Sequence, residues 1–178
     1  EKAAAEKAAA EKAAAEKAAA GKTTAEKAAA ENELLHLFIV SDDSSLIPFS
    51  VRKQLILAGT EHLSNICYHE TGPYIISKSI FPSYFQKDQA SVIESQARID
   101  LAIFIQIAKY LGIKGRYVGE EPTSLVTGIY NQIMLQELPK KAIDCIVVPR
   151  KTYKDGPISA STAVSYTHLR AHETPEHL

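Results

Sequence analysis

Apolar runs and helical patterns alternate along the middle of the chain. The apolar runs, each followed by residues that favour turns, are 34–40, 66–68, 116–118 and 143–148. Apolar residues also recur at helical spacing between these runs, in residues 48–59, 88–111 and 125–134. Strands that alternate with helices imply parallel pairing with right-handed crossovers. The pattern therefore predicts an α/β fold built on one small, doubly wound parallel sheet.

Several of these elements carry expectations about burial. Residues 34–40 are apolar almost throughout, as a strand buried on both faces requires, and we interpret His36 as a core or strand-start residue rather than a ligand. The residues of helix 88–111 that we expect near one face are Val92, Gln96, Ile99, Ile103, Ile107 and Tyr110. Gly112 follows as the predicted end of that helix. The apolar side of helix 48–59 is expected to contain Phe49, Leu55 and Ile56.

Residues 74–87 show no clear period, although they contain several aromatic side chains and Pro82. Long loops in compact domains are usually functional or mobile. Two interpretations are open at this point. The segment is either an apolar flap packed on the sheet or a loop that contacts a substrate.

The stretch from Lys114 to Met134 is the centre of the functional interpretation. Its strand ends at Gly119, and Pro122 then lies near the start of a helix. Thr123 or Ser124 can cap that helix. A strand that ends in glycine before a helix start is where open α/β sheets bind nucleotides, because the backbone is accessible and the helix end favours phosphate. The competing interpretation is an ordinary strand–helix loop.

Both ends of the chain differ in composition from the middle. Residues 1–30 are six five-residue units, five of them EKAAA and one GKTTA, which predicts a low-complexity helix. Successive units are rotated by about 140°, so no apolar stripe forms and the helix is expected to be solvated. Residues 163–178 are expected to be a disordered, non-native tail, because VSYTHLRAHET resembles a translated sequencing adapter. Residues 31–162 are accordingly expected to be the natural part of the chain and to form a partial domain.

Composition narrows the possible functions. A formal net charge of −1 gives no overall basic field, so neither nucleic acid nor an anionic membrane is a predicted partner. The cysteines, Cys67 and Cys145, lie within apolar runs and are interpreted as buried free thiols in a reducing compartment, not as a metal site or disulfide. The sequence has no apolar span of about 18 residues and no signal-peptide pattern. These features predict a soluble, cytoplasmic protein.

Residues 26–162 resemble the C-terminal nucleotidyltransferase domain of the citrate (pro-3S)-lyase ligase family, also called acetate:citrate-lyase ligases. The resemblance rests on HLFIVSDDSSLIPFSVR, TGPYIISKSIFPSYF, RYVGEEPTSLVTGIYNQIM and VVPRKTYKDGPISAS. It implies a Rossmann-like, HxGH-type parallel sheet with flanking helices. It also implies that ATP activates acetate as acetyl-adenylate, with Mg²⁺ expected alongside ATP. The acetyl group then passes to the CoA-derived prosthetic-group thiol of the citrate lyase acyl-carrier subunit, which switches on citrate lyase for citrate fermentation.

The resemblance also implies roles for individual residues. The residues implied at the nucleotide are Gly119, Glu120, Tyr130, Asn131, Ser159 and Ser161. The basic residues implied near phosphate or substrate are Arg52, Arg150 and Lys151. For each basic residue a solvated surface role is an equal alternative. For the Tyr130–Asn131 pair the alternative is local packing and capping.

The sequence also departs from the family pattern. It contains no His-x-Gly-His motif, and the EKAAA repeats occupy the place of the first strand, that motif and the start of its helix. We also expect the family's N-terminal acetyltransferase-like domain to be missing, and ISAS runs into the adapter-like tail where the family has Val-Arg and a closing helix. We therefore expect an impaired ligase fragment with no identified catalytic residue. The alternatives are an adenylyltransferase of the pantetheine-phosphate type, an inactive nucleotide-binding module, and a fragment that docks on the acyl-carrier subunit.

Overall fold

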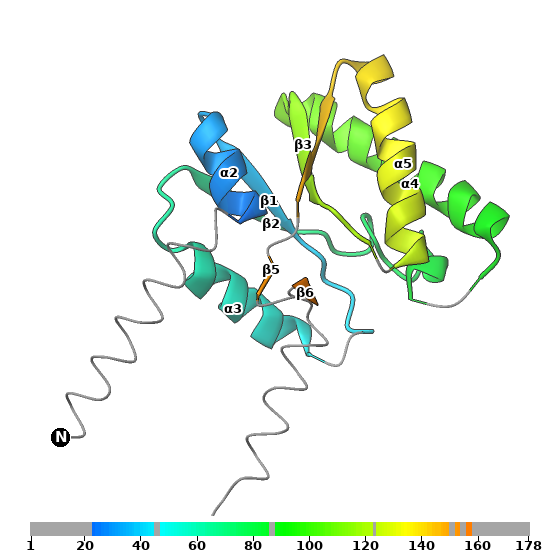
Figure 1. Ribbon diagram of the computed structural model, residues 1–178, viewed down its shortest axis with the longest axis horizontal. Helices are drawn as coiled ribbons and strands as arrows, with labels where there is room; N and C mark the ends of the chain where they lie inside the picture. Colours follow the sequence, from blue (N-terminus) through cyan, green and yellow to red (C-terminus); the bar gives the residue numbers. More distant parts are fainter. Residues whose placement is uncertain are drawn as a thin grey trace, which may run out of the picture. The chain divides into compact units, whose positions relative to one another are not determined.

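The computed structural model describes residues 23–44, 47–85, 88–122, 124–149, 152–153 and 156–157 (Figure 1). The chain divides into two compact units, Lys22–Pro149 and a second made of Glu1–Gly21 with Arg150–Leu178. The described part of the second unit is an antiparallel pair of short strands, β5 (Thr152–Tyr153) and β6 (Gly156–Pro157). Residues 1–22 of the EKAAA-type repeat and the predicted tail at 163–178 lie outside the described residues.

The unit Lys22–Pro149 alternates strands and helices, as the sequence predicts. Its elements are α2 (Thr24–Glu31), β1 (Leu35–Ile39), α3 (Phe49–Thr60), β2 (Ile66–Glu70), η1 (Pro82–Tyr84), α4 (Ala90–Leu111), β3 (Gly115–Gly119), α5 (Leu125–Glu137), η2 (Pro139–Lys141) and β4 (Asp144–Val148). This alternation confirms the predicted α/β class.

Among the described helices, none has the length and apolar character needed to cross a membrane.

The strands form two separate pairs instead of the single sheet that the sequence predicts. β1 pairs in parallel with β2, and β3 pairs in parallel with β4, so the predicted parallel pairing is confirmed. No described strand joins β1 to β3 by backbone hydrogen bonds, and each pair is a two-stranded sheet of its own. A cavity of about 690 Å³ is lined by both β1 and β3, with Ala28 of α2 and Phe104 of α4 also in its wall. The prediction of one continuous sheet is wrong because no described strand occupies this position.

The same cavity explains the exposure of β1. The continuous apolar run predicts a strand buried on both faces, yet Ile39 is the buried residue of β1 and the other four are half-buried. Leu34, just before the strand, is 52% exposed. The prediction of full burial is wrong, because β1 borders the cavity on the edge that β2 does not cover.

Helix α4 packs through a different face from the one that its sequence suggests. Ile99 is 54% exposed and Tyr110 is 90% exposed, so the predicted face is wrong. The buried residues of α4 are Ile93, Ala97, Asp100, Leu101, Phe104, Ile105 and Ala108. Apolar residues lie on more than one side of this helix, and spacing alone does not choose between the sides. The face with the two buried alanines packs into the core shared with α5, because small side chains permit close approach.

The apolar residues of α5 and α3 are buried only in part. Leu125 is 65% exposed at the start of α5, whereas Ile133 and Met134 of the same helix are buried. Leu55 is 61% exposed on α3, whose buried residue is Thr60. In both helices the described packing covers only part of the apolar surface.

Two of the predicted helix boundaries are confirmed. Gly112 ends α4 with φ of 70°, a left-handed conformation that glycine adopts without steric cost. Ser124 caps α5, since its side chain accepts a hydrogen bond from the Thr127 N–H. The other candidate cap, Thr123, lies outside the described residues.

The segment 74–87 packs into the core in part, which favours the flap interpretation for that part. Phe81 is 0% exposed and Ile75 is 3% exposed, and both belong to the core cluster. Ile76 has a positive φ of 47°, and the buried carboxylate of Asp100 accepts its N–H at 2.6 Å. Asp100 therefore holds this segment against α4.

Candidate functional site

The carboxyl end of β3 brings together three of the predicted nucleotide-binding residues. Gly119 ends β3 opposite Val148 of β4, and the Glu120 N–H donates to the Val148 carbonyl at 2.8 Å. The Asn131 side chain, which is 8% exposed on α5, donates from Nδ2 to the Gly119 carbonyl at 3.1 Å. Asn131 therefore fixes the orientation of the Gly119 peptide, while Gly119 and Glu120 themselves are exposed.

The space beside Gly119 is open. A Cβ atom added at Gly119 would meet no atom closer than the Thr24 Oγ1, which is 4.0 Å away. Thr24 is the first residue of α2, so the carboxyl end of β3 lies near the start of this helix. This combination of an accessible backbone and a nearby helix start is suited to an anionic ligand.

The start of α2 nevertheless carries a negative charge. Thr23 and Glu26 form a capping box, in which the Glu26 carboxylate accepts the Thr23 N–H at 2.6 Å and the Thr23 hydroxyl accepts the Glu26 N–H at 3.1 Å. His62 contacts the same carboxylate at 3.1 Å. A carboxylate at this position competes with phosphate for the helix N–H groups and repels it.

Tyr130 lies in the core, away from the open space at Gly119. It is 2% exposed, and its hydroxyl donates to the buried Asp100 carboxylate. Arg116 of β3 donates to the Tyr130 oxygen at 3.4 Å and lies over the Phe104 ring. Burial raises the pKa of Tyr130, and burial also raises the pKa of Asp100 although two hydrogen bonds act in the opposite direction. These contacts agree with the packing alternative for Tyr130.

Arg52 braces the loop that follows β1. Its guanidinium donates to the carbonyl of Val40 at 2.9 Å and to that of Ile47 at 3.1 Å, and a third bond reaches the Asp42 carbonyl. The Asp43 carboxylate lies 3.9 Å away. Arg52 therefore orders the chain at the carboxyl end of β1, and its donors are directed at backbone.

The remaining predicted phosphate ligands are not among the residues that the structure describes. These are Arg150, Lys151, Ser159 and Ser161, and their roles stay predictions. The predicted site residues that the structure brings together at the end of β3 are Gly119, Glu120 and Asn131.

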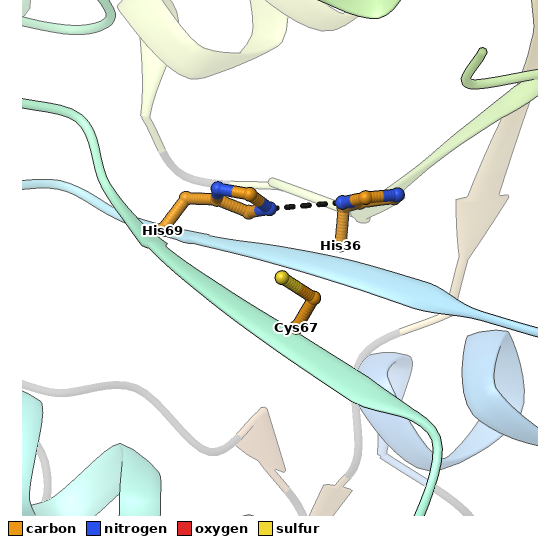
Figure 2. Close-up of side chains that lie close together, drawn as sticks. All are labelled: His36, Cys67 and His69. Atoms are coloured by element: carbon orange, nitrogen blue, oxygen red, sulfur yellow. Dashed lines mark hydrogen bonds between the residues drawn. The ribbon is translucent and has the colours of Figure 1, made fainter. Parts of the chain in front are cut away.

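A second group of chemically active side chains lies on β1 and β2. His36 pairs with Cys67 in the strand register, and Phe38 pairs with His69. Since side chains two apart in a strand share a face, His36, Cys67 and His69 project from one face of this pair (Figure 2). The His36 Nδ1 and His69 Nε2 atoms are 2.8 Å apart, and the potential ligand atoms of all three residues lie within 4.8 Å of one another.

Sequence reasoning missed this group. It ends the second strand at residue 68 and assigns His69 to a turn, whereas β2 continues to Glu70. The prediction of free thiols is confirmed for Cys67 and Cys145, although both are half-buried instead of fully buried. A signal was present in the Cys-x-His spacing, which places both side chains on one face once the residues belong to a strand.

The comparisons with known proteins converge on one family. A family model described as the citrate lyase ligase C-terminal domain matches residues 19–176. A citrate (pro-3S)-lyase ligase of Haemophilus influenzae is 44% identical over 134 residues, which are 72% of this chain and 40% of that protein. The ligase of the same name from Escherichia coli is 41% identical over 133 residues, 71% of this chain and 38% of that protein.

The chain spans about two fifths of the length of the curated relatives it matches. A third such relative, from Klebsiella pneumoniae, is 38% identical over 132 residues. No solved structure matches the chain.

Proposed function

Because the chain belongs to the citrate lyase ligase C-terminal domain family, we propose that it derives from an ATP-dependent ligase that activates citrate lyase. In the proposed reaction, an acetate oxygen attacks the α-phosphorus of ATP, which forms acetyl-adenylate and releases diphosphate. The prosthetic-group thiol of the acyl-carrier subunit then attacks the acetyl carbon. A thioester forms, AMP leaves, and the thiol proton passes to solvent. The family match and the open backbone at Gly119 support this proposal.

The proposed nucleotide site lies at the carboxyl end of β3. Gly119 lets the nucleotide approach the backbone, Asn131 holds the Gly119 peptide in place, and Glu120 lies beside them. Ser159, Ser161, Arg150 and Lys151 stay proposed phosphate ligands, because adenylate formation needs donors and positive charge where negative charge develops. Mg²⁺ fits this chemistry because it prefers phosphate and carboxylate oxygens. We propose a cytoplasmic location, because a reaction that uses ATP and a free thiol suits a reducing compartment.

We further propose that the family's sheet contains one more strand, between β1 and β3. Both strands line the 690 Å³ cavity, and α2 contacts both of them. A parallel strand that leads into α2 and returns as β1 would make a right-handed crossover if it lay in that cavity. The full order would be β2, β1, added strand, β3, β4, and the strand order would reverse beside β3. Open α/β sheets bind nucleotides at such a reversal.

This added strand explains why the chain is expected to be impaired. The EKAAA units stand where the strand and its HxGH motif are expected, and Ala, Glu and Lys are poor strand formers. The phosphate-binding histidines of that motif would be absent together with the strand. Loss of such groups costs orders of magnitude in rate, because they act where charge develops in the transition state.

Acetate-dependent exchange between ATP and diphosphate tests the ligase assignment. We expect little exchange from the chain as it stands. We expect strong exchange from a chimera in which residues 1–22 are replaced by the corresponding segment of the Haemophilus influenzae relative. Exchange that needs pantetheine phosphate instead of acetate would assign the other adenylyltransferase type. Strong exchange by the unaltered chain would contradict the impairment.

Titration of the chimera with Mg²⁺–ATP in a calorimeter tests the position of the nucleotide. Gly119→Ala and Gly119→Val should weaken ATP binding progressively, because the added atoms enter space that the protein leaves open. Gly59→Ala is the matched control, since a Cβ at Gly59 enters open space with no atom within 4 Å. Equal ATP affinity in all of these variants would remove Gly119 from the site.

A further inference from the structure

We propose that His36, Cys67 and His69 form a binding site for a divalent metal ion of the zinc type. No part of the proposed ligase reaction uses these residues, and the proposal does not depend on that reaction. Two of the residues come from β2 and one from β1, and the parallel register brings them together on one face (Figure 2). A search of the described residues for histidine, cysteine and acidic side chains close enough to share one ion finds these three.

The separations are close to those that a metal requires. Zinc bonds of about 2.0–2.1 Å to nitrogen and 2.3 Å to sulfur put tetrahedral ligand atoms about 3.3–3.6 Å apart. The two imidazole nitrogens are 2.8 Å apart, and no pair of ligand atoms exceeds 4.8 Å. Small rotations of the side chains would open the nitrogen–nitrogen distance by about 0.5 Å. The same rotations would set the nitrogen–sulfur distances to about 3.6 Å.

The donor set determines the type of ion. Two imidazoles and a thiolate suit Zn²⁺ and similar borderline-soft ions, whereas Mg²⁺ and Ca²⁺ prefer oxygen.

The surroundings restrict the position of His69. Its ring contacts those of His36, at 5.1 Å between centroids, and Phe38, at 4.9 Å. Phe38 in turn contacts Phe104 of α4 edge-on. A ligand held in this way needs little reorganisation on metal binding. His36 also lines the cavity beside β1, so a water molecule can reach a fourth position on the ion from that side.

A hydrogen bond between two imidazoles is the competing account of the same geometry. One ring would donate to the other at 2.8 Å, and Cys67 would be a neighbouring packed thiol. That account predicts no metal affinity and no dependence on Cys67. The two accounts therefore differ in a direct measurement.

Titration of the reduced full chain with Co²⁺, followed by displacement with Zn²⁺, provides that measurement. A bound thiolate gives Co²⁺ a near-ultraviolet charge-transfer band, and a tetrahedral site gives intense visible bands. We expect both in the unaltered chain. Cys67→Ser should abolish the charge-transfer band and weaken Co²⁺ binding by at least about 100-fold, because loss of a ligand exceeds the roughly 10–100-fold effect of an outer-shell partner.

Cys145→Ser is the matched control, because Cys145 is the other free, half-buried cysteine. It should leave both spectral features and the affinity unchanged. His36→Gln should weaken binding and retain the charge-transfer band, which separates ligand loss from loss of folding. Circular dichroism of each variant checks that the fold is intact.

The three tail histidines, His168, His172 and His177, could bind Co²⁺ adventitiously. A chain with all three changed to glutamine should keep the charge-transfer band if the proposal is correct. Absence of the band in the unaltered chain would overturn the proposal. Its loss in Cys145→Ser, or affinity that depends only on the tail histidines, would overturn it as well.

Discussion

The two strand pairs of the unit Lys22–Pro149 are alike in length and direction, but the helices near them pack differently. Helix α4 buries seven residues, and it shares a core with α5. Figure 1 shows α4 and α5 next to each other, and α5 also contacts β4. Helix α3 has Thr60 as its buried residue. Similar sequence patterns therefore produce one region held by apolar packing and another that is largely half-buried.

The less densely packed region depends more on polar contacts. Arg52 braces the loop after β1, and Asn65 donates to the carbonyls of Ala29 and Asn32 at 2.9 Å each. The hydroxyl groups of Thr60 and Tyr68 are 2.8 Å apart. This region also contains the histidine–cysteine group and borders the cavity. Groups that can bind a ligand need exposure, and the open packing of β1 and β2 supplies it.

Truncating one leucine in each region should give the largest contrast in stability. Leu101 is 1% exposed in α4, whereas Leu55 is 61% exposed in α3. Leu101→Ala should lower the free energy of unfolding by about 2–5 kcal/mol, because it removes buried surface and leaves a cavity. Leu55→Ala should change it by less than about 0.5 kcal/mol. Urea denaturation followed by circular dichroism measures both, and equal losses would mean that the two helices pack alike.

The same contrast shows how far the sequence predicts the structure. The strand positions and the ends of α4 and α5 follow from local chemistry, such as the left-handed Gly112 and the Ser124 cap. The buried face of α4 does not, because Ile99 and Leu101 are equally apolar and only the packing partner distinguishes them. The division into two sheets does not follow from local chemistry either, because it depends on there being no described strand between β1 and β3.

The candidate sites divide in a similar way. Gly119 lies at a strand end before a helix, and this local pattern was readable in the sequence. The contact from Asn131 to the Gly119 carbonyl depends on how α5 packs. From the sequence, Asn131 is a candidate site residue only through the family resemblance. The group formed by His36, Cys67 and His69 depends on strand register across a separation of 33 residues between the histidines. Register of that kind is set by tertiary structure.

Replacing an arginine should cost more stability in the region of β1 and β2 than in the region of α4 and α5, which is the opposite of the result expected for leucine. Arg52 donates to backbone carbonyls after β1, whereas Arg98 of α4 contacts Glu137 of α5 at 3.0 Å with its own side chain 49% exposed. Arg52→Ala should cost about 1.5–3 kcal/mol, the contribution of hydrogen bonds from a charged group. Arg98→Ala should cost less than about 1 kcal/mol, because exposed ion pairs contribute little. Chemical denaturation measures both values, and a larger loss for Arg98→Ala would show that this polar bracing is unimportant.

The smallest effect is expected from two carboxyl groups, Asp100 and Asp42, whose contributions to stability should change with pH in opposite directions. Burial raises the pKa of Asp100 in the α4 core above its usual 3.8. The folded state then binds protons more tightly than the unfolded state, so the contribution of Asp100 to stability falls as pH rises from about 3.8 through the raised pKa. The pKa of Asp42, after β1, is lowered: burial acts upward, but hydrogen bonds from Ser44 and Lys78 outweigh it. Its contribution is present above 3.8 and is lost as pH falls through the lowered pKa.

Asparagine at each position removes the titration while retaining a side-chain oxygen that accepts hydrogen bonds. Asp100→Asn should therefore gain stability relative to the unaltered chain as pH rises through its window. Asp42→Asn should gain relative stability as pH falls, which is the opposite sign. Urea denaturation of the three proteins at a series of pH values gives these differences. Difference curves of the same sign would contradict the assignment of Asp100 to a desolvated core and of Asp42 to a hydrogen-bonded loop, because burial and hydrogen bonding favour different protonation states.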